Sequence, residues 1–147
     1  MQVVAIMRSL KCELQPTQQS QDGGIDHRGL WTLPDMEVDV VTQCKNESNR
    51  VGVKYIREFH GVLQSAFPPT TVGLFASASG FSLYAQRFLL RMTHPAILCT
   101  VDTDLDRLTS FQLNDRAQTL LPKLTVGSLF VRQEHALVLT YGNVILG

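Results

Sequence analysis

The sequence predicts an α/β fold in which a mixed β-sheet is flanked by helices and followed by a C-terminal β-hairpin. Apolar, strand-like runs alternate with amphipathic helical stripes between residues 25 and 101, which is typical of strand–helix–strand units. Prolines punctuate this alternation at the end of one helix and at the start of a strand. The chain has 147 residues, enough to bury a core of its own, so we expect one domain over residues 1–147.

Composition limits the function classes. Hydrophobic residues make up 44% of the chain, and no apolar run reaches membrane-spanning length. Thirteen basic side chains balance thirteen acidic ones, so DNA binding would need a local basic patch rather than a global positive charge. The three cysteines, Cys12, Cys44 and Cys99, lie far apart without paired spacing, which argues against a structural zinc site and for reduced thiols.

The first part of the chain predicts one helix and three strands. The apolar pattern of Gln2–Leu10 fits the end of a helix packed on a sheet, and Lys11–Leu14 is expected to be a short strand. Ile25–Leu33 and Val38–Lys45 read as longer strands, the second rich in β-branched residues, with a turn at Pro34-Asp35 between them.

An amphipathic helix is predicted over Val53–Phe67. Its apolar residues recur at i, i+3/i+4 and i+7, and Pro68-Pro69 ends it. We expect Phe59, Leu63 and Phe67 to face the sheet because they lie along one stripe of this helix.

A second strand–helix–strand unit follows. Thr71–Ala76 is a short apolar strand, and Ser79 is the expected N-cap of a helix that runs to Met92. Ala96–Val101 is the next strand. The acidic run Asp102–Asp106 lacks the glycine and terminal glutamate of a calcium loop, so it is expected to be a polar turn.

The last part of the chain predicts a short helix and a hairpin. Asn114 is the expected cap of a helix through Leu121. Leu129–Val131 and Ala136–Thr140 are expected to pair across Gln133-Glu134.

The candidate site lies between Asp22 and Lys45. Glycines precede Ile25-Asp26 and suit a tight turn that delivers a carboxylate to the start of a strand. Because side chains alternate along a strand, Gln43 and Lys45 point to the same face. If the two strands pair, Asp26, Gln43 and Lys45 converge. A carboxylate, a second oxygen ligand and a lysine suit a hard cation with an activated water.

These motifs resemble the PD-(D/E)xK nuclease superfamily, in the branch of Mrr-type restriction enzymes and archaeal Holliday junction resolvases. The branch carries a glycine-rich run ending in Gly-Ile-Asp and a strand ending in Gln-Cys-Lys or Glu-Cys-Lys. Here these are Gly24-Ile25-Asp26 and Gln43-Cys44-Lys45. Gly29-Leu30-Trp31, Arg57 to Gly61 and Leu113 to Ala117 also resemble a fungal mitochondrial family named for being required for respiratory growth. The resemblance covers roughly residues 21–121.

The resemblance implies a restriction-endonuclease-like core and metal-dependent hydrolysis of phosphodiester bonds in DNA. Asp26, Gln43 and the main-chain carbonyl of Cys44 would bind Mg²⁺ or Mn²⁺, and Lys45 would orient or help deprotonate the attacking water. The narrower resemblance implies a mitochondrial location and a part in mitochondrial DNA maintenance. A homodimer is compatible with this resemblance.

Several alternatives stay open. Asp26 alone reads as a turn residue, Lys45 as a solvated lysine, and Lys54 and Arg57 as solvated helix residues that form at most weak DNA contacts. Members of the superfamily often carry a metal-binding glutamate in a longer first helix, whereas no acidic residue precedes Glu13. We therefore expect a chain with a shortened first helix, or a site that works without that glutamate. The rival function is a catalytically inactive nuclease fold that serves as a nucleic-acid-binding or scaffold module.

Overall fold

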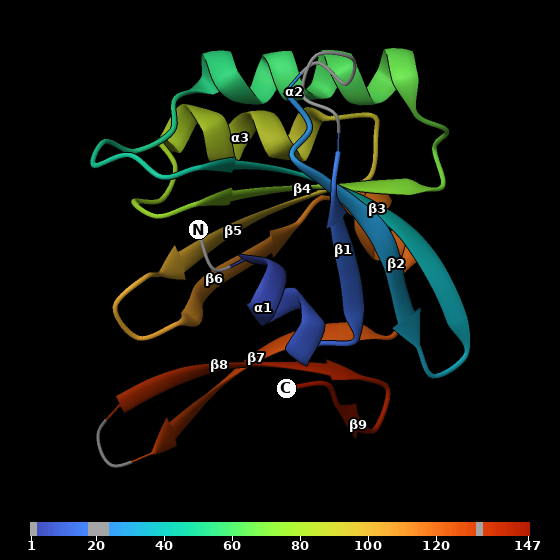
Figure 1. Ribbon diagram of the computed structural model, residues 1–147, viewed down its shortest axis with the longest axis vertical. Helices are drawn as coiled ribbons and strands as arrows, with labels where there is room; N and C mark the ends of the chain where they lie inside the picture. The colour runs from blue at the N-terminus through green and yellow to red at the C-terminus, as the bar shows by residue number, and fades with distance from the viewer. Residues whose placement is uncertain (1–2, 18–23, 132–133) are drawn as a thin grey trace.

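The computed structural model describes residues 3–17, 24–131 and 134–147. It shows a six-stranded mixed sheet, β1 to β6, and a second, three-stranded antiparallel sheet (Figure 1). The helices are α1 (Val3–Ser9), α2 (Val53–Ala66), α3 (Leu83–Arg91) and α4 (Asp115–Leu120). The strands are β1 (Cys12–Pro16), β2 (His27–Leu33), β3 (Met36–Lys45), β4 (Thr71–Ser77), β5 (Ala96–Asp102), β6 (Arg107–Leu113), β7 (Leu124–Val131), β8 (Glu134–Tyr141) and β9 (Val144–Ile145).

The strand order of the larger sheet follows the chain order. β1, β2 and β3 form an antiparallel meander, β3, β4 and β5 are parallel, and β6 returns antiparallel to β5. The crossovers through α2 and α3 place both helices on one face of the sheet, while α1 and the β7–β9 sheet lie on the other (Figure 1). The carboxyl ends of β3, β4 and β5 therefore meet at one edge of the sheet.

A separate hydrophobic cluster lies on each face of the six-stranded sheet. Under α2 and α3, Phe59 packs edge-on against Phe75, and both rings are buried. On the α1 side Trp31 is fully buried and donates its indole N–H to the Leu10 carbonyl at 2.8 Å. The hydrogen bond satisfies the one polar atom of a side chain that is otherwise surrounded by apolar groups.

The orientation predicted for α2 is confirmed for two of its three residues. Phe59 and Leu63 are 1% and 0% exposed, whereas Phe67 caps the helix and is half-buried. Leu63 sits directly over Gly73 of β4, where an added Cβ would lie 2.5 Å from Leu63 Cδ1. The missing side chain of Gly73 thus lets the helix approach the sheet closely.

The predicted N-cap of α3 is wrong. The cap is Ser82, whose hydroxyl accepts the Ala85 N–H at 3.1 Å, and the helix begins at Leu83. Ser79 instead donates its hydroxyl to the Asn49 carbonyl. Phe81 forms a bridge to Val51 and is buried, so the chain stays extended for three residues longer than the apolar pattern indicates.

Strand boundaries also differ from the prediction. β2 begins at His27 rather than at Ile25. β1 begins at Cys12 rather than at Lys11, because Lys11 adopts a left-handed backbone conformation with φ of 75°. The sequence pattern predicts no element over 107–113, where β6 forms. A register shift at Thr100/Val101 of β5 disturbs the pairing with this strand.

The C-terminal hairpin is present but longer than predicted. It pairs β7 with β8 over eight residues each, and β9 adds a third strand. Glu134, predicted in the turn, is the first residue of β8, whereas Gln133 lies outside the described residues. The predicted Asn114 cap is confirmed, since its side-chain oxygen accepts the Ala117 N–H. None of the helices in the described part of the chain is long and apolar enough to cross a membrane.

Candidate active site

The segment before β2 positions the Asp26 main chain. Gly24 has φ of 92°, a left-handed conformation that a glycine adopts without strain. The Asp26 N–H then donates to the Thr42 carbonyl at 2.8 Å, and its carbonyl accepts the Thr17 N–H at 3.0 Å. These two bonds continue the pairing of β2 with its neighbours by one residue, so Asp26 lies beside the last residues of β3.

The Asp26 carboxylate is bound to the backbone of β3. Its Oδ2 accepts the Cys44 N–H at 2.7 Å, a charge-assisted hydrogen bond that links the two halves of the predicted motif. Among the described residues, Oδ1 has no hydrogen-bond partner. Burial, and secondarily the Asp26 charge, raises the pKa of the Cys44 thiol to about 12. Cys44 is therefore a neutral thiol, and its contribution to the site comes from its main chain.

Gln43 is the next residue of the site. By strand alternation it lies on the same face as Val41, which is buried under the helices. Its amide is close to Gly24, where an added Cβ would lie 3.4 Å from Gln43 Nε2. The glycine-rich turn and the β3 terminus are thus in contact through Gln43, in addition to the Asp26–Cys44 hydrogen bond.

The Lys45 side chain contacts two residues that the sequence did not single out for the site. Its Nζ lies 3.3 Å from Glu47 Oε1 and 3.7 Å from the centroid of the Tyr55 ring. Partial burial lowers the pKa of Lys45, but the hydrogen bond and charge of Glu47, together with Tyr55, outweigh it and leave the pKa above its ordinary value. The amine is therefore protonated at neutral pH.

Sequence reasoning missed Glu47 and Tyr55 as neighbours of Lys45. Tyr55 falls on the apolar stripe of α2, which the sequence assigns to the core, yet its ring is half-exposed and faces Lys45. Glu47 follows Lys45 by two residues, and a continued alternation is the one signal that would place it on the same face. Between the described residues Asp26 and Lys45, no ion pair is formed.

The two residues predicted as weak DNA contacts lie along α2. Lys54 and Arg57 are both exposed. Lys54 Nζ is 5.9 Å from the Tyr55 ring centroid, and the Arg57 guanidinium is 5.7 Å from that of Phe88. Only Lys54 is therefore next to the candidate site, through the ring that it shares with Lys45.

The donor atoms at the strand junction fit a hard cation. The Asp26 carboxylate, the Gln43 amide oxygen and the Cys44 carbonyl are all oxygen donors, and Mg²⁺ is often bound through one or two carboxylates with water and substrate phosphate completing its shell. Within the described ranges, no group of three His, Cys, Asp or Glu side chains is placed to hold a metal. Among these three oxygen donors, the Asp26 carboxylate is the one that carries a charge.

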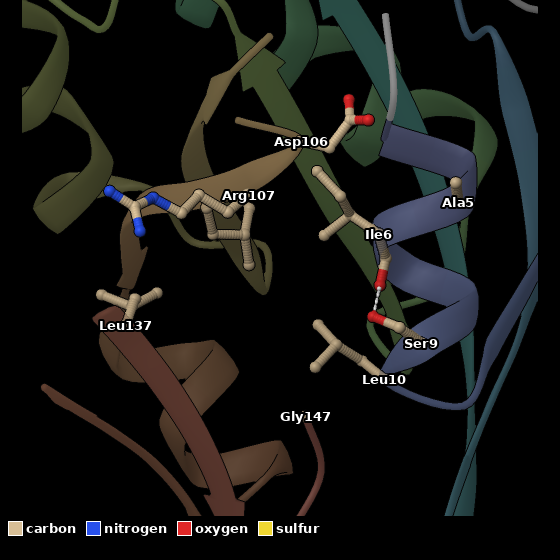
Figure 2. Close-up of a pocket in the computed structure, with 9 residues that line it drawn as sticks. Ala5, Ile6, Ser9, Leu10, Asp106, Arg107, Leu137 and Gly147 are labelled. Atoms are coloured by element: carbon tan, nitrogen blue, oxygen red, sulfur yellow. Dashed lines mark hydrogen bonds between the residues drawn. The ribbon is translucent and has the colours of Figure 1, made fainter. Parts of the chain in front are cut away.

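A separate hollow lies on the opposite face of the sheet. It has a volume of about 270 Å³ and is formed by α1, the start of β6 and Leu137 of β8 (Figure 2). Its walls are mainly apolar, and Ile6 of α1 and Leu10, which follows the helix, point into it. This hollow contains none of the predicted site residues.

Comparison with known proteins agrees with the motifs. A family model described as restriction endonuclease (Mrr_cat) matches residues 2–108. This range contains the Asp26 turn, the whole of β3 and both covering helices. The chain belongs to this restriction endonuclease family.

Two similar proteins extend the comparison. The chain is similar to the uncharacterized mitochondrial protein C824.03c of Schizosaccharomyces pombe, with 28% identity over 114 residues. It also resembles the structure of the DNA modification-dependent restriction endonuclease AspBHI, with 25% identity and a TM-score of 0.55 over 70% of the chain. The chain spans 46% of the length of the first protein and 28% of the second. In each case the chain therefore matches one part of a longer protein.

Proposed function

We propose that this chain is a metal-dependent DNA endonuclease domain that hydrolyses phosphodiester bonds. The observation that carries the proposal is the hydrogen bond from the Cys44 N–H to Asp26, because it brings the only charged oxygen donor of the motif to the end of the Gln43–Lys45 strand. Membership of the restriction endonuclease family supports DNA as the substrate class.

In this proposal Asp26, the Gln43 amide oxygen and the Cys44 carbonyl hold Mg²⁺ or Mn²⁺. When bound, the cation supplies Lewis-acid polarisation of the scissile phosphate. A water oxygen attacks phosphorus and its proton passes to solvent, while the bond from phosphorus to the leaving oxygen breaks and that oxygen takes up a proton from solvent. Lys45 is protonated, so it stabilises the negative charge that develops on the phosphate oxygens and does not accept the proton of the water.

Plasmid cleavage by the purified chain tests this function. We expect nicking with Mg²⁺ or Mn²⁺, no nicking with EDTA, and loss of nicking in Asp26→Asn purified in parallel. Cleavage that persists in Asp26→Asn would come from a contaminating nuclease or another site and would contradict the proposal.

The second candidate is an inactive nuclease fold that binds nucleic acid. Two observations favour it. α1 contains no acidic residue in the sequence Val3–Ser9, and Lys45 is paired with Glu47 instead of facing Asp26. DNA binding without cleavage under either metal would select this function over the first.

A mitochondrial location is proposed from the Schizosaccharomyces pombe protein, whose description includes it. Fluorescence microscopy of the full-length protein with a C-terminal tag, compared with a mitochondrial stain, measures the location. A purely nuclear signal would contradict it.

A further inference from the structure

A polar hollow lies beside the candidate active site at the same edge of the sheet. It has a volume of about 260 Å³, below the roughly 300–1,000 Å³ of pockets for drug-sized ligands. Its polar lining comes from the loop after β3, the β4–α3 turn, α3 and the facing side of β5 and β6. These lining residues are Arg50, Ser79, Gln86, Thr100, Ser110 and Gln112.

The hollow is in register with Lys45. Strand pairing aligns Lys45 with Ser77, Ser77 with Thr100, and Thr100 with Ser110. Paired residues of neighbouring strands point to the same face, so this row runs across the helix-covered side from the candidate site to the hollow. Two to three strand spacings of about 4.8 Å separate Lys45 from the hollow, or roughly 10–14 Å.

The hydrogen bonds within the hollow leave donors available for a ligand. The Ser110 hydroxyl donates to Thr100 Oγ1 at 2.7 Å, so the Thr100 hydroxyl proton is available. Gln112 uses one amide N–H to bind Gln86 Oε1, and Gln86 in turn donates to the Phe81 carbonyl. The second amide N–H of Gln112 is therefore also available. Among the residues that the structure describes, no carboxylate lines the hollow.

Arg50 supplies the positive charge, and its backbone is fixed on both sides. The preceding carbonyl, of Asn49, accepts the Ser79 hydroxyl. The following residue, Val51, exchanges main-chain hydrogen bonds of 2.9 Å with Gly80 and Ser82. Arg50 is exposed, and in the described part of the chain its guanidinium forms no ion pair. The nearest acidic residue along β5, Asp102, uses Oδ1 to accept the Asp104 and Leu105 N–H groups of its own turn.

We propose that this hollow binds a non-scissile backbone phosphate of the DNA that occupies the candidate active site. The inference rests on the proposed function. A guanidinium with uncharged donors and no carboxylate suits an anionic phosphate rather than a neutral base, and the volume is sufficient for one phosphate. Because the hollow lies roughly 10–14 Å from Lys45, it would contact a phosphate within a few nucleotides of the scissile one.

Duplex binding in EDTA tests the inference without cleavage. Arg50→Gln should weaken binding about tenfold, the loss expected for one charge-assisted hydrogen bond, and lower the salt slope by about one. The matched control is Arg116→Gln, which removes the same charge from an exposed position on α4, beside Asn114 at the opposite end of β5. The control should change binding less than twofold.

Single neutral methylphosphonates, placed in turn along one strand, identify the phosphate that is contacted. At one position the substitution should weaken the wild type about tenfold and leave Arg50→Gln unaffected, because the partner charge is already gone. Equal losses in both proteins at every position, or equal behaviour of Arg50→Gln and Arg116→Gln, would overturn the phosphate site while leaving the proposed nuclease function intact. A wild type that fails to bind duplex DNA would instead overturn the proposed function itself.

Discussion

The Asp26 carboxylate accepts the main-chain N–H of Cys44 at 2.7 Å, across 18 positions of sequence. This bond links the Asp26 side chain to the Gln-Cys-Lys strand and leaves the second carboxylate oxygen available for a cation or solvent. Asp26 thus has two functions, the hydrogen bond to the Cys44 main chain and a negative charge for a cation. Substitution can separate them.

Asp26→Asn keeps the size of the side chain and an oxygen that can accept the Cys44 N–H, but it removes the negative charge. We expect weaker Mg²⁺ binding and loss of cleavage, since the site contains no other carboxylate among its proposed ligands. Isothermal calorimetry with Mg²⁺ measures the first effect and plasmid nicking the second. If the wild type binds no Mg²⁺ in either the presence or absence of DNA, the metal-dependent function is wrong.

Lys45→Ala should separate metal binding from cleavage. Removal of a nearby positive charge leaves Mg²⁺ affinity unchanged or slightly higher, while cleavage is lost because the developing negative charge is no longer stabilised. Calorimetry and nicking on the same preparation measure both quantities. Full cleavage by Lys45→Ala would remove this lysine from the mechanism.

Glu47→Gln should lower the pKa of Lys45, because Glu47 provides the hydrogen bond and charge that raise it. The raised pKa means that the interaction stabilises the fold below the ordinary lysine pKa and is lost as the pH rises through the folded value. Cleavage that requires protonated Lys45 should therefore decline at a lower pH in the variant. Glu37→Gln, at the opposite end of β3, is the control and should leave the pH profile of cleavage unchanged.

Leu63→Ala should cost about 2–5 kcal/mol of unfolding free energy, since the side chain is fully buried between α2 and Gly73. Gly73→Ala should also destabilise, by about 1–3 kcal/mol through overpacking. The double variant should lose less unfolding free energy than the sum of the two single losses, because the methyl group added by Gly73→Ala would occupy part of the space that Leu63 vacates. Denaturant unfolding measures all three, and strict additivity would show that the two positions are not in contact.

Gly29→Ala should be more destabilising than Gly73→Ala. An added Cβ at Gly29 would lie 1.6 Å from the Glu13 carbonyl oxygen of β1, so main chain rather than a side chain has to move. Gly61→Ala is the matched control, since nothing lies within 4 Å of its added Cβ and alanine favours the α2 helix by up to about 1 kcal/mol. Thermal unfolding compares the stabilities of these variants. A Gly29→Ala variant as stable as Gly61→Ala would contradict the pairing of β1 with β2.

The sequence by itself determined most of the elements and the motif, because each of these depends on local periodicity or on adjacent residues. The stripe of α2, the strand ending at Lys45 and the glycine turn before Asp26 are all visible in consecutive residues. Only the tertiary structure decided what the side chains contact. Tyr55 fits the apolar stripe yet faces Lys45, and Thr100 and Ser110 carry no motif until strand pairing aligns them with Lys45. Such contacts join residues far apart in the chain, so they depend on register and packing that local patterns do not encode.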